Sequence, residues 1–159
     1  MPVSSYIRLI VLLTASLALM TPGCGKGVSE EDAVRAVIED MADAANHKDA
    51  GRLKEHISGS YKDPGGNDHD ALKGIIAYNF IRADSINVFL RKTDIKVNGD
   101  RAHATVRAVI SRGGKVESMA DLVPESAAGF IFDFEFTKDG SDWLLTSAIW
   151  RQVGVAEAL

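Results

Sequence analysis

The 159-residue chain is poor in cysteine and proline and has no cluster of basic residues. Its single cysteine excludes an internal disulfide, so the fold must be held by packing alone. It has 18 basic and 22 acidic residues, and the dispersed Lys and Arg exclude nucleic acid as a partner, because phosphate binding requires clustered positive charge. With 46% hydrophobic and 25% charged residues, the composition is that of one globular domain.

No apolar run reaches the roughly 20 residues that a membrane-spanning helix needs. The longest, Leu9–Met20, follows Arg8 and is ended by Thr21, Pro22 and Gly23, directly before Cys24. A positive start, a short apolar run and a helix-breaking end are typical of a signal peptide. We therefore predict a signal over residues 1–23 and a short tether over 24–28.

The end of this segment resembles a bacterial lipoprotein signal, in which the cysteine thiol is acylated and becomes the first residue after cleavage. Gly23 and Cys24 match that pattern, whereas Thr21 and Pro22 depart from the usual Leu and Ala or Ser. The resemblance implies lipidation at Cys24, and simple secretion is the alternative. Gly25 after the cysteine resembles outer-membrane lipoproteins, which implies a cell-envelope protein facing the periplasm.

Three helices are predicted before any strand. Ser29 followed by three acidic residues is a helix start, and apolar residues spaced by three and four predict a helix over about 30–48. A short helix is expected near Ala50 to Ile57. A Gly-rich loop over 61–69 then leads to a third helix that is capped by Asp68 or Asp70.

From Ile86 the apolar residues alternate with a period of two, which predicts strands. We expect an irregularity near Thr93, a tight hairpin at 98–100, and a strand with a small apolar face that ends at Gly113. Four phenylalanines in alternation predict a strand over 130–136, and the last strand is predicted over 143–152. Residues 29–152 thus form one α+β domain, with helices on one face of a curved antiparallel sheet, and 153–159 form a tail.

The element order and the closing run Phe134–Trp150 resemble the nuclear transport factor 2-like superfamily, which includes SnoaL-like and ketosteroid-isomerase-like proteins and shares the cystatin-like fold. The resemblance implies a cone, a sheet wrapped around the first helix with a pocket at the open end, and often a dimer across the sheet. The fold hosts isomerases, dehydratases and binding modules, so it implies shape rather than chemistry. No residue here matches a catalytic position of that family, and none is carried over.

Five residues are candidates for ligand contact. Tyr61 and Asp63, at the expected cone mouth, form either an acid–base pair or a structural turn with the tyrosine hydroxyl at the surface. Asn79 is the polar residue expected inside the cone. Trp143 and Trp150 have opposite parity in one strand, so we expect them on opposite faces, with only one in the cavity.

The acidic residues 63, 68 and 70 lack the spacing of a calcium loop, and the four histidines lack metal-ligand spacing, so no metal or cofactor is predicted. The sequence favours a membrane-tethered, non-catalytic domain that binds a small apolar ligand or an envelope protein partner. The alternative is a small isomerase-, dehydratase- or hydrolase-like enzyme that uses the cone pocket. A homodimer is a further candidate assembly.

Overall fold

The structure is a computed structural model that describes residues 28–113 and 127–159. The predicted signal over 1–23, the lipidation site Cys24 and nearly all of the tether lie outside the described residues. The elements, in chain order, are α2 Glu30–Asn46, α3 Ala50–Glu55, α4 His69–Arg82, β1 Ile86–Asn98, β2 Arg101–Arg112, β3 Ala127–Asp139, β4 Asp142–Val153 and α5 Val155–Ala158.

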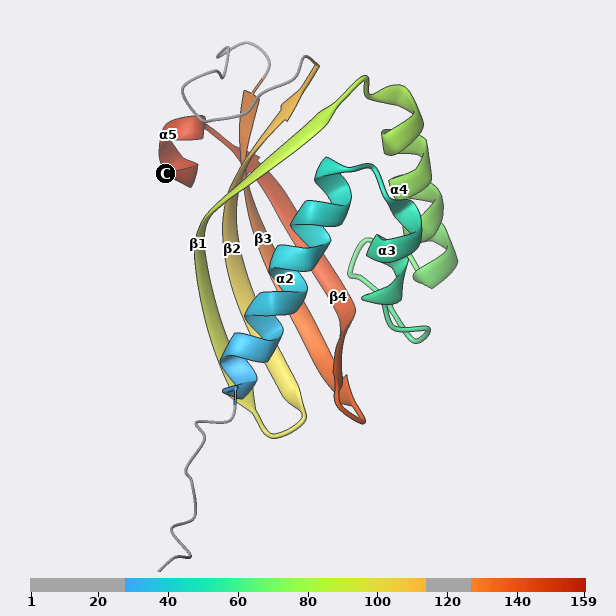
Figure 1. Cartoon of the computed structure of the whole chain (residues 1–159), viewed down its shortest axis with the longest axis vertical. Coiled ribbons are helices and arrows are strands. Elements are labelled where there is room, and N and C mark those ends of the chain that lie inside the picture. The colour runs from blue at the N-terminus through green and yellow to red at the C-terminus, as the bar shows by residue number, and fades with distance from the viewer. Residues whose placement is uncertain (1–27, 114–126) are drawn as a thin grey trace, which may run out of the picture.

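Helix α2 lies along the concave face of the sheet (Figure 1). It begins as predicted, because the Ser29 hydroxyl accepts a hydrogen bond from the Asp32 amide at 3.1 Å. Val34 and Ile38, four residues apart, are buried on the face toward the sheet. The helix ends at Asn46, and Lys48 has a left-handed φ of 54°, which turns the chain toward α3.

The four strands form one antiparallel sheet in the order β1-β2-β3-β4, so every connection joins neighbours. The predicted hairpin is confirmed, with Asn98 paired to Arg101 and Gly99 at a φ of 63°, a conformation that glycine adopts freely. The expected irregularity in β1 is a register shift between Leu90 and Lys92, slightly before the predicted position.

The concave face of the sheet combines small and large side chains. Strand β2 presents Ala102, Ala104, Val106 and Ala108, all buried, which lets α2 pack closely. Strand β3, which the alternating phenylalanines predicted, presents their side chains on this face, and the rings of Phe132 and Phe134 stack at 5.4 Å. The core therefore lies between the central strands and α2.

Strand β4 contains a bulge that the sequence did not reveal. Glu135 pairs with Ser147 and the next residue of β3, Phe136, pairs with Leu145, so Thr146 is an extra residue. Thr146 shifts the alternation of inward and outward side chains along β4 by one position. A residue before Thr146 and a residue after it therefore point to the same face when one has an odd number and the other an even number. Trp143 and Trp150 consequently both face the concave side, and the prediction that they lie on opposite faces is wrong.

Residues 153–159 were predicted to be a tail, but they return to the domain. Val153 extends β4, and α5 then packs against the outer face of β3, where Ala158 is fully buried. A β-carbon on Gly129 would lie 2.6 Å from the Gly154 carbonyl oxygen, so this close approach requires glycine. A four-residue helix is too short to give a periodic signal in the sequence.

Candidate ligand-binding cavity

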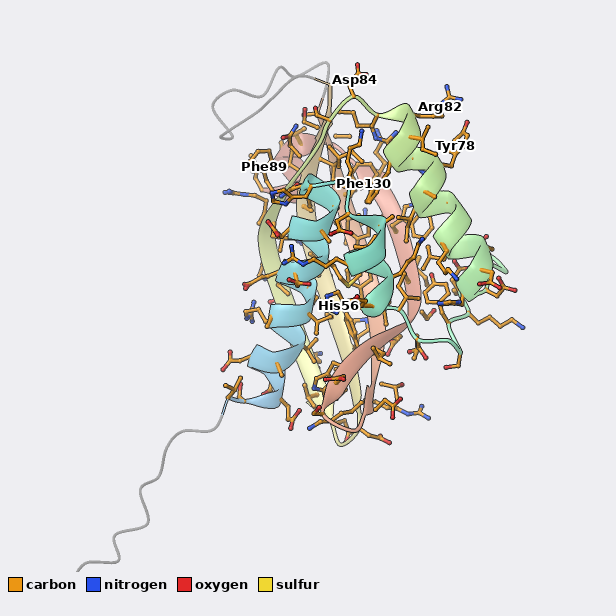
Figure 2. All side chains as sticks on the ribbon, turned by 45° about the vertical axis from the view of Figure 1, so that its right-hand side comes forward. His56, Tyr78, Arg82, Asp84, Phe89 and Phe130 are labelled. Atoms are coloured by element: carbon orange, nitrogen blue, oxygen red, sulfur yellow. The ribbon has the colours of Figure 1, made fainter. Side chains whose placement is uncertain are left out.

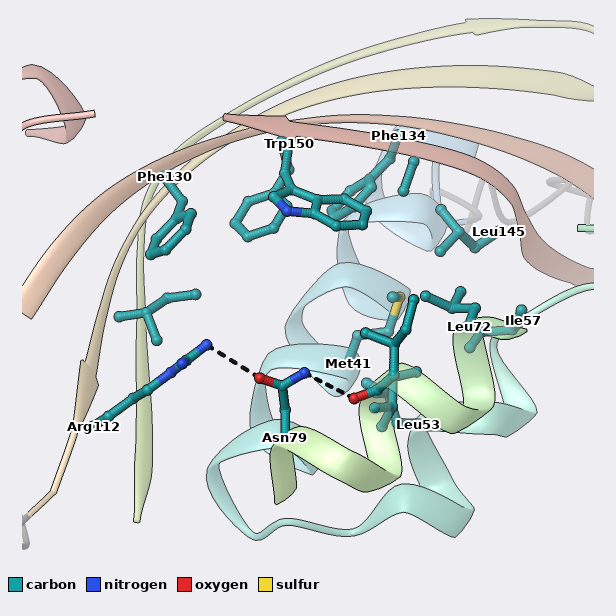
Figure 3. A pocket seen from close by; sticks show the side chains of 15 residues that line it. Met41, Leu53, Ile57, Leu72, Asn79, Arg112, Phe130, Phe134, Leu145 and Trp150 are labelled. Carbon is teal, nitrogen blue, oxygen red and sulfur yellow. Dashed lines mark hydrogen bonds between the residues drawn. The ribbon is translucent and has the colours of Figure 1, made fainter. Parts of the chain in front are cut away.

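An apolar cavity of about 330 Å³ opens between the concave face of the sheet and helices α3 and α4. Its sheet wall carries Phe130, Phe132, Phe134 and Trp150, and α4 contributes Leu72 and other apolar side chains to the facing wall (Figure 3). The phenylalanine stripe lines the interior because β3 places alternate residues on one face, while Asp133 on the other face bonds Thr105. The cavity has the concave, apolar character of a small-molecule site.

A second apolar hollow of about 180 Å³ lies beside the cavity, beneath α2. The two spaces share Met41, Phe132 and Phe134, and the second is bounded on its far side by Leu90 of β1. Methionine is unbranched and adaptable, and Met41 lies at the boundary between the two spaces.

Fifteen of the described residues line the first cavity, and two of them are polar, Asn79 and Arg112. They come from opposite walls, Asn79 from α4 and Arg112 from the last position of β2, and extend toward each other (Figure 3). The Asn79 amide nitrogen donates to the Ile75 carbonyl oxygen at 2.8 Å, which turns its amide oxygen toward Arg112. The Arg112 guanidinium donates to that oxygen over 3.4 Å, a long hydrogen bond.

A polar hollow adjoins this rim and shares Asn79 and Arg112 with the cavity. Tyr78, Arg82 and Asp84 lie together there, at the end of α4 (Figure 2). The Arg82 guanidinium donates to the Tyr78 hydroxyl at 2.7 Å and lies 5.2 Å from the centre of its ring. The cavity is thus apolar inside and carries charged groups at its rim.

Of the five predicted ligand contacts, Asn79 and Trp150 line the cavity. Trp143 instead belongs to the core, and its indole nitrogen donates to a Glu30 carboxylate oxygen at 2.9 Å. Arg112 was missed in the sequence, although the signal was present. It shares the parity of Ala108 and Ile110, the inward residues of the same strand.

Tyr61 and Asp63 do not line the cavity. Both are buried, and the Tyr61 hydroxyl donates to an Asp63 carboxylate oxygen at 3.1 Å, so it is not at the surface. The chain here runs beside the β4 bulge, where the Lys62 amide donates to the Thr146 carbonyl oxygen at 2.9 Å. This pair therefore lies in the core rather than at the cone mouth.

The electrostatics of the pair argue against acid–base catalysis. Burial raises the pKa of the Tyr61 phenol far above its usual value, and the neighbouring Asp63 charge raises it further. Hydrogen bonds, first from the Asn67 side chain, lower the pKa of Asp63. Proton transfer near neutral pH needs groups whose pKa values approach 7, and both shifts lead away from it. The pair therefore does not fit the acid–base interpretation. Its role is structural, because its hydrogen bonds fix the loop that leads to Asn67.

A second charged cluster fastens α3 to α2. Arg52 donates to both carboxylate oxygens of Asp40 and to Asp43, and His56 Nε2 lies 2.6 Å from Asp40. These bonds, those of Arg52 first, lower the pKa of Asp40 to about 2. The cluster is separate from the cavity lining and holds α3, which carries Leu53 into that lining.

The acidic residues at either end of the Gly-rich loop have structural partners. Asp68 caps α4 by accepting from the Ala71 amide at 2.9 Å, and Asp63 binds Asn67. Across residues 28–113 and 127–159, no three His, Cys, Asp or Glu side chains are grouped as metal ligands would be. Among the same residues, no helix is both long and apolar enough to cross a membrane.

The comparisons with known proteins show the fold. No family model matches the chain and no curated relative matches it in sequence. In structure it is similar to a presumptive dehydratase of the NTF2-like family from Streptomyces avermitilis, with 18% identity over 77% of this chain and 95% of that one and a TM-score of 0.64.

Two further solved structures are similar to this chain. A protein with a cystatin-like fold from Caulobacter vibrioides is 14% identical over 80% of this chain and 92% of its own, with a TM-score of 0.63. Bd1075 of Bdellovibrio bacteriovorus is 12% identical over 76% of this chain, with a TM-score of 0.63, and the match spans 40% of its own length. The chain therefore has the nuclear transport factor 2-like, or cystatin-like, α+β fold that its sequence predicted.

Proposed function

We propose that this domain is a non-catalytic binding module for a small apolar molecule held in the cavity between the sheet and α4. The observation that carries the proposal is the lining, in which thirteen of fifteen residues are apolar. The two polar ones are a carboxamide and a guanidinium, and a guanidinium stays protonated at neutral pH. Among the described residues, the lining offers no carboxylate, imidazole or thiol to move a proton, so it supports binding better than the enzymatic alternative.

Filling the cavity tests this function. Ala148 lies in the cavity wall beside Phe134, and Ala148→Phe places a ring in the space that a ligand would occupy. We use decanol as the probe and isothermal titration calorimetry as the measurement. The unsubstituted chain is expected to bind decanol, and Ala148→Phe is expected to weaken binding by about tenfold or more, because the apolar contact area is lost.

Ala71→Phe is the matched control, because Ala71 is exposed at the first turn of α4 and does not line the cavity. This variant should bind decanol as the original chain does. Absence of decanol binding to the original chain, or equal weakening by both variants, would overturn the proposal. Turnover of a hydrophobic metabolite that Ala148→Phe abolishes would favour the enzymatic alternative.

We further propose that the domain is tethered to a cell-envelope membrane through acylated Cys24, as the segment Leu9–Cys24 suggests. The described geometry is compatible with such a tether. Glu30, at the start of α2, bonds Lys138 and Trp143 at the β3–β4 hairpin, whereas Arg112 lies at the other end of the strands (Figure 1). An anchor before α2 would leave the cavity rim facing away from the membrane. Mass measurement of the mature amino-terminal peptide tests this: acyl chains on Cys24 support the tether, and an unmodified cysteine excludes it.

A further inference from the structure

We infer that the ligand is an anionic amphiphile, with an apolar body in the cavity and a single carboxylate bound by Arg112 at the rim. The inference rests on the proposed function and specifies the chemical class of its ligand. It follows from the position of one guanidinium at the end of an otherwise apolar space. A molecule that fills such a space gains from apolar burial along its body and from a charge-assisted hydrogen bond at its head.

The N–H groups of the Arg112 guanidinium are weakly hydrogen-bonded. Within the described residues, its guanidinium forms the 3.4 Å hydrogen bond to Asn79 and lies within ion-pair distance of no carboxylate. Arg52, by contrast, bonds two carboxylates, and Arg151 pairs with Glu157 at 3.0 Å. Because a guanidinium presents a planar fork of donors that matches a carboxylate, Arg112 can donate two parallel hydrogen bonds to a ligand carboxylate.

The charges around the rim favour an anion of low charge. Among the described residues at the rim, Arg82 and Arg112 are cationic and Asp84 is anionic, which leaves one excess positive charge there, in a chain whose formal net charge is -4. Helix α4 ends at Arg82, and the negative end of its dipole therefore lies at the rim. This partial negative charge opposes a phosphate dianion more strongly than a carboxylate, so a monocarboxylic acid is the better match.

Asn79 acts as a positioning residue for Arg112. Its amide is oriented by the bond to the Ile75 carbonyl oxygen, and it presents its own oxygen to the guanidinium. A bound carboxylate would replace this long hydrogen bond with shorter charge-assisted ones. The apolar walls near the rim strengthen the interaction, because they exclude water from one side of the charge pair.

The experiment compares decanoate with decanol, which have the same chain length and differ in the head group. Binding is measured by calorimetry at low ionic strength and neutral pH on the original chain, Arg112→Gln and Arg101→Gln. Arg101 is the matched control because it is exposed at the opposite end of the same strand. We expect decanoate to bind the original chain about tenfold more tightly than decanol, the ratio that one charge-assisted hydrogen bond supplies.

Arg112→Gln is expected to remove that preference and to change the affinity for decanol by less than about twofold, while Arg101→Gln retains the preference. Unchanged circular dichroism and thermal unfolding of Arg112→Gln confirm that the variant is folded. Equal affinities of the original chain for the two probes would overturn the inference. So would an equal loss of preference in both variants, because general electrostatic attraction would then account for it.

The two proposals fail in different ways. If decanol binds, Ala148→Phe blocks it, and decanoate binds no more tightly, the cavity is a ligand site and only the carboxylate inference is wrong. If neither probe binds the original chain, both the proposed function and this inference are overturned.

Discussion

The two tryptophans of β4 face the same side of the sheet but occupy opposite environments. Trp143 is 2% exposed and bonds Glu30 through its indole nitrogen, whereas Trp150 is 44% exposed and lines the cavity. The difference arises from what covers each ring. Trp143 lies where α2 begins, and the Lys138 ammonium group is 5.9 Å from the centre of its ring. Trp150 pairs across the sheet with Phe132 and faces the open space between the sheet and α4.

The same residue type therefore builds a closed end and an open end of one cone. At the closed end, α2 contributes Val34 and Ile38 to the core, so that the aromatic side chains there are enclosed. At the open end, α4 fully buries only Leu72 and exposes Ile81 to solvent. The open end thus leaves apolar side chains exposed, whereas the closed end encloses them.

The largest expected effect follows from truncating the enclosed ring. Trp143→Ala should lower the free energy of unfolding by about 3–5 kcal/mol, because it leaves a void in the packed core and removes a partner of Glu30. Trp150→Ala should lower it by less than about 1 kcal/mol, because its ring already borders solvent and an open space. Urea unfolding of the two variants measures the difference. Equal destabilisation would show that the open end is as tightly packed as the closed end.

An intermediate loss of stability is expected for Tyr61 and Tyr78, which also contrast a buried ring with an exposed one. Tyr61→Phe removes the buried hydroxyl that bonds Asp63 and should cost about 1–2 kcal/mol, because the carboxylate loses a partner that water cannot replace. Tyr78 is 58% exposed at the cavity rim, and Tyr78→Phe should change stability by less than about 0.5 kcal/mol. Thermal unfolding of both variants gives the comparison. A larger loss of stability from Tyr78→Phe than from Tyr61→Phe would contradict the division of the domain into a closed end and an open end.

The sequence contained most of the fold but less of the cavity. Periodicity of three and four predicted the helices, and the alternating phenylalanines predicted a strand, because these patterns reflect burial on one face. The faces of Trp143 and Trp150 could not be predicted, because the bulge at Thr146 shifts the register and carries no local signature. The burial of Tyr61 and Asp63 depends on pairing with that same bulge, which is a long-range contact.

For Arg112, unlike the two tryptophans, the face was predictable from the sequence but the role was not. Its inward parity was readable from the alternation in β2, but its role depends on the distance to α4, which only the tertiary structure provides. The carboxyl-terminal helix was missed for a related reason, since a short segment becomes helical here by packing on Gly129. Where no bulge interrupts a strand, patterns along the chain thus predict which face a residue occupies, and they do not predict what lies opposite.

The smallest expected effect concerns the carboxylate that completes the closed end. Hydrogen bonds from Lys138, and then from Trp143, lower the pKa of Glu30 below its usual value of 4.5. A lowered folded-state pKa means that the ionised group stabilises the fold at neutral pH, and that this contribution is lost as pH falls below 4.5 and through the lowered value. Glu30→Gln should therefore unfold at a lower temperature than the original chain at pH 7, by less than Trp143→Ala does.

The difference between Glu30→Gln and the original chain should close as the pH is lowered from about 4.5, because Glu30 is then neutral in both the folded and unfolded chain. Glu31→Gln is the matched control, because Glu31 is its exposed neighbour in the first turn of α2. Both carboxylates lie at the positive end of the same helix dipole, so the control removes that shared effect. A pH dependence of equal size in the two variants would show that the helix dipole, rather than the bonds to Lys138 and Trp143, stabilises the closed end.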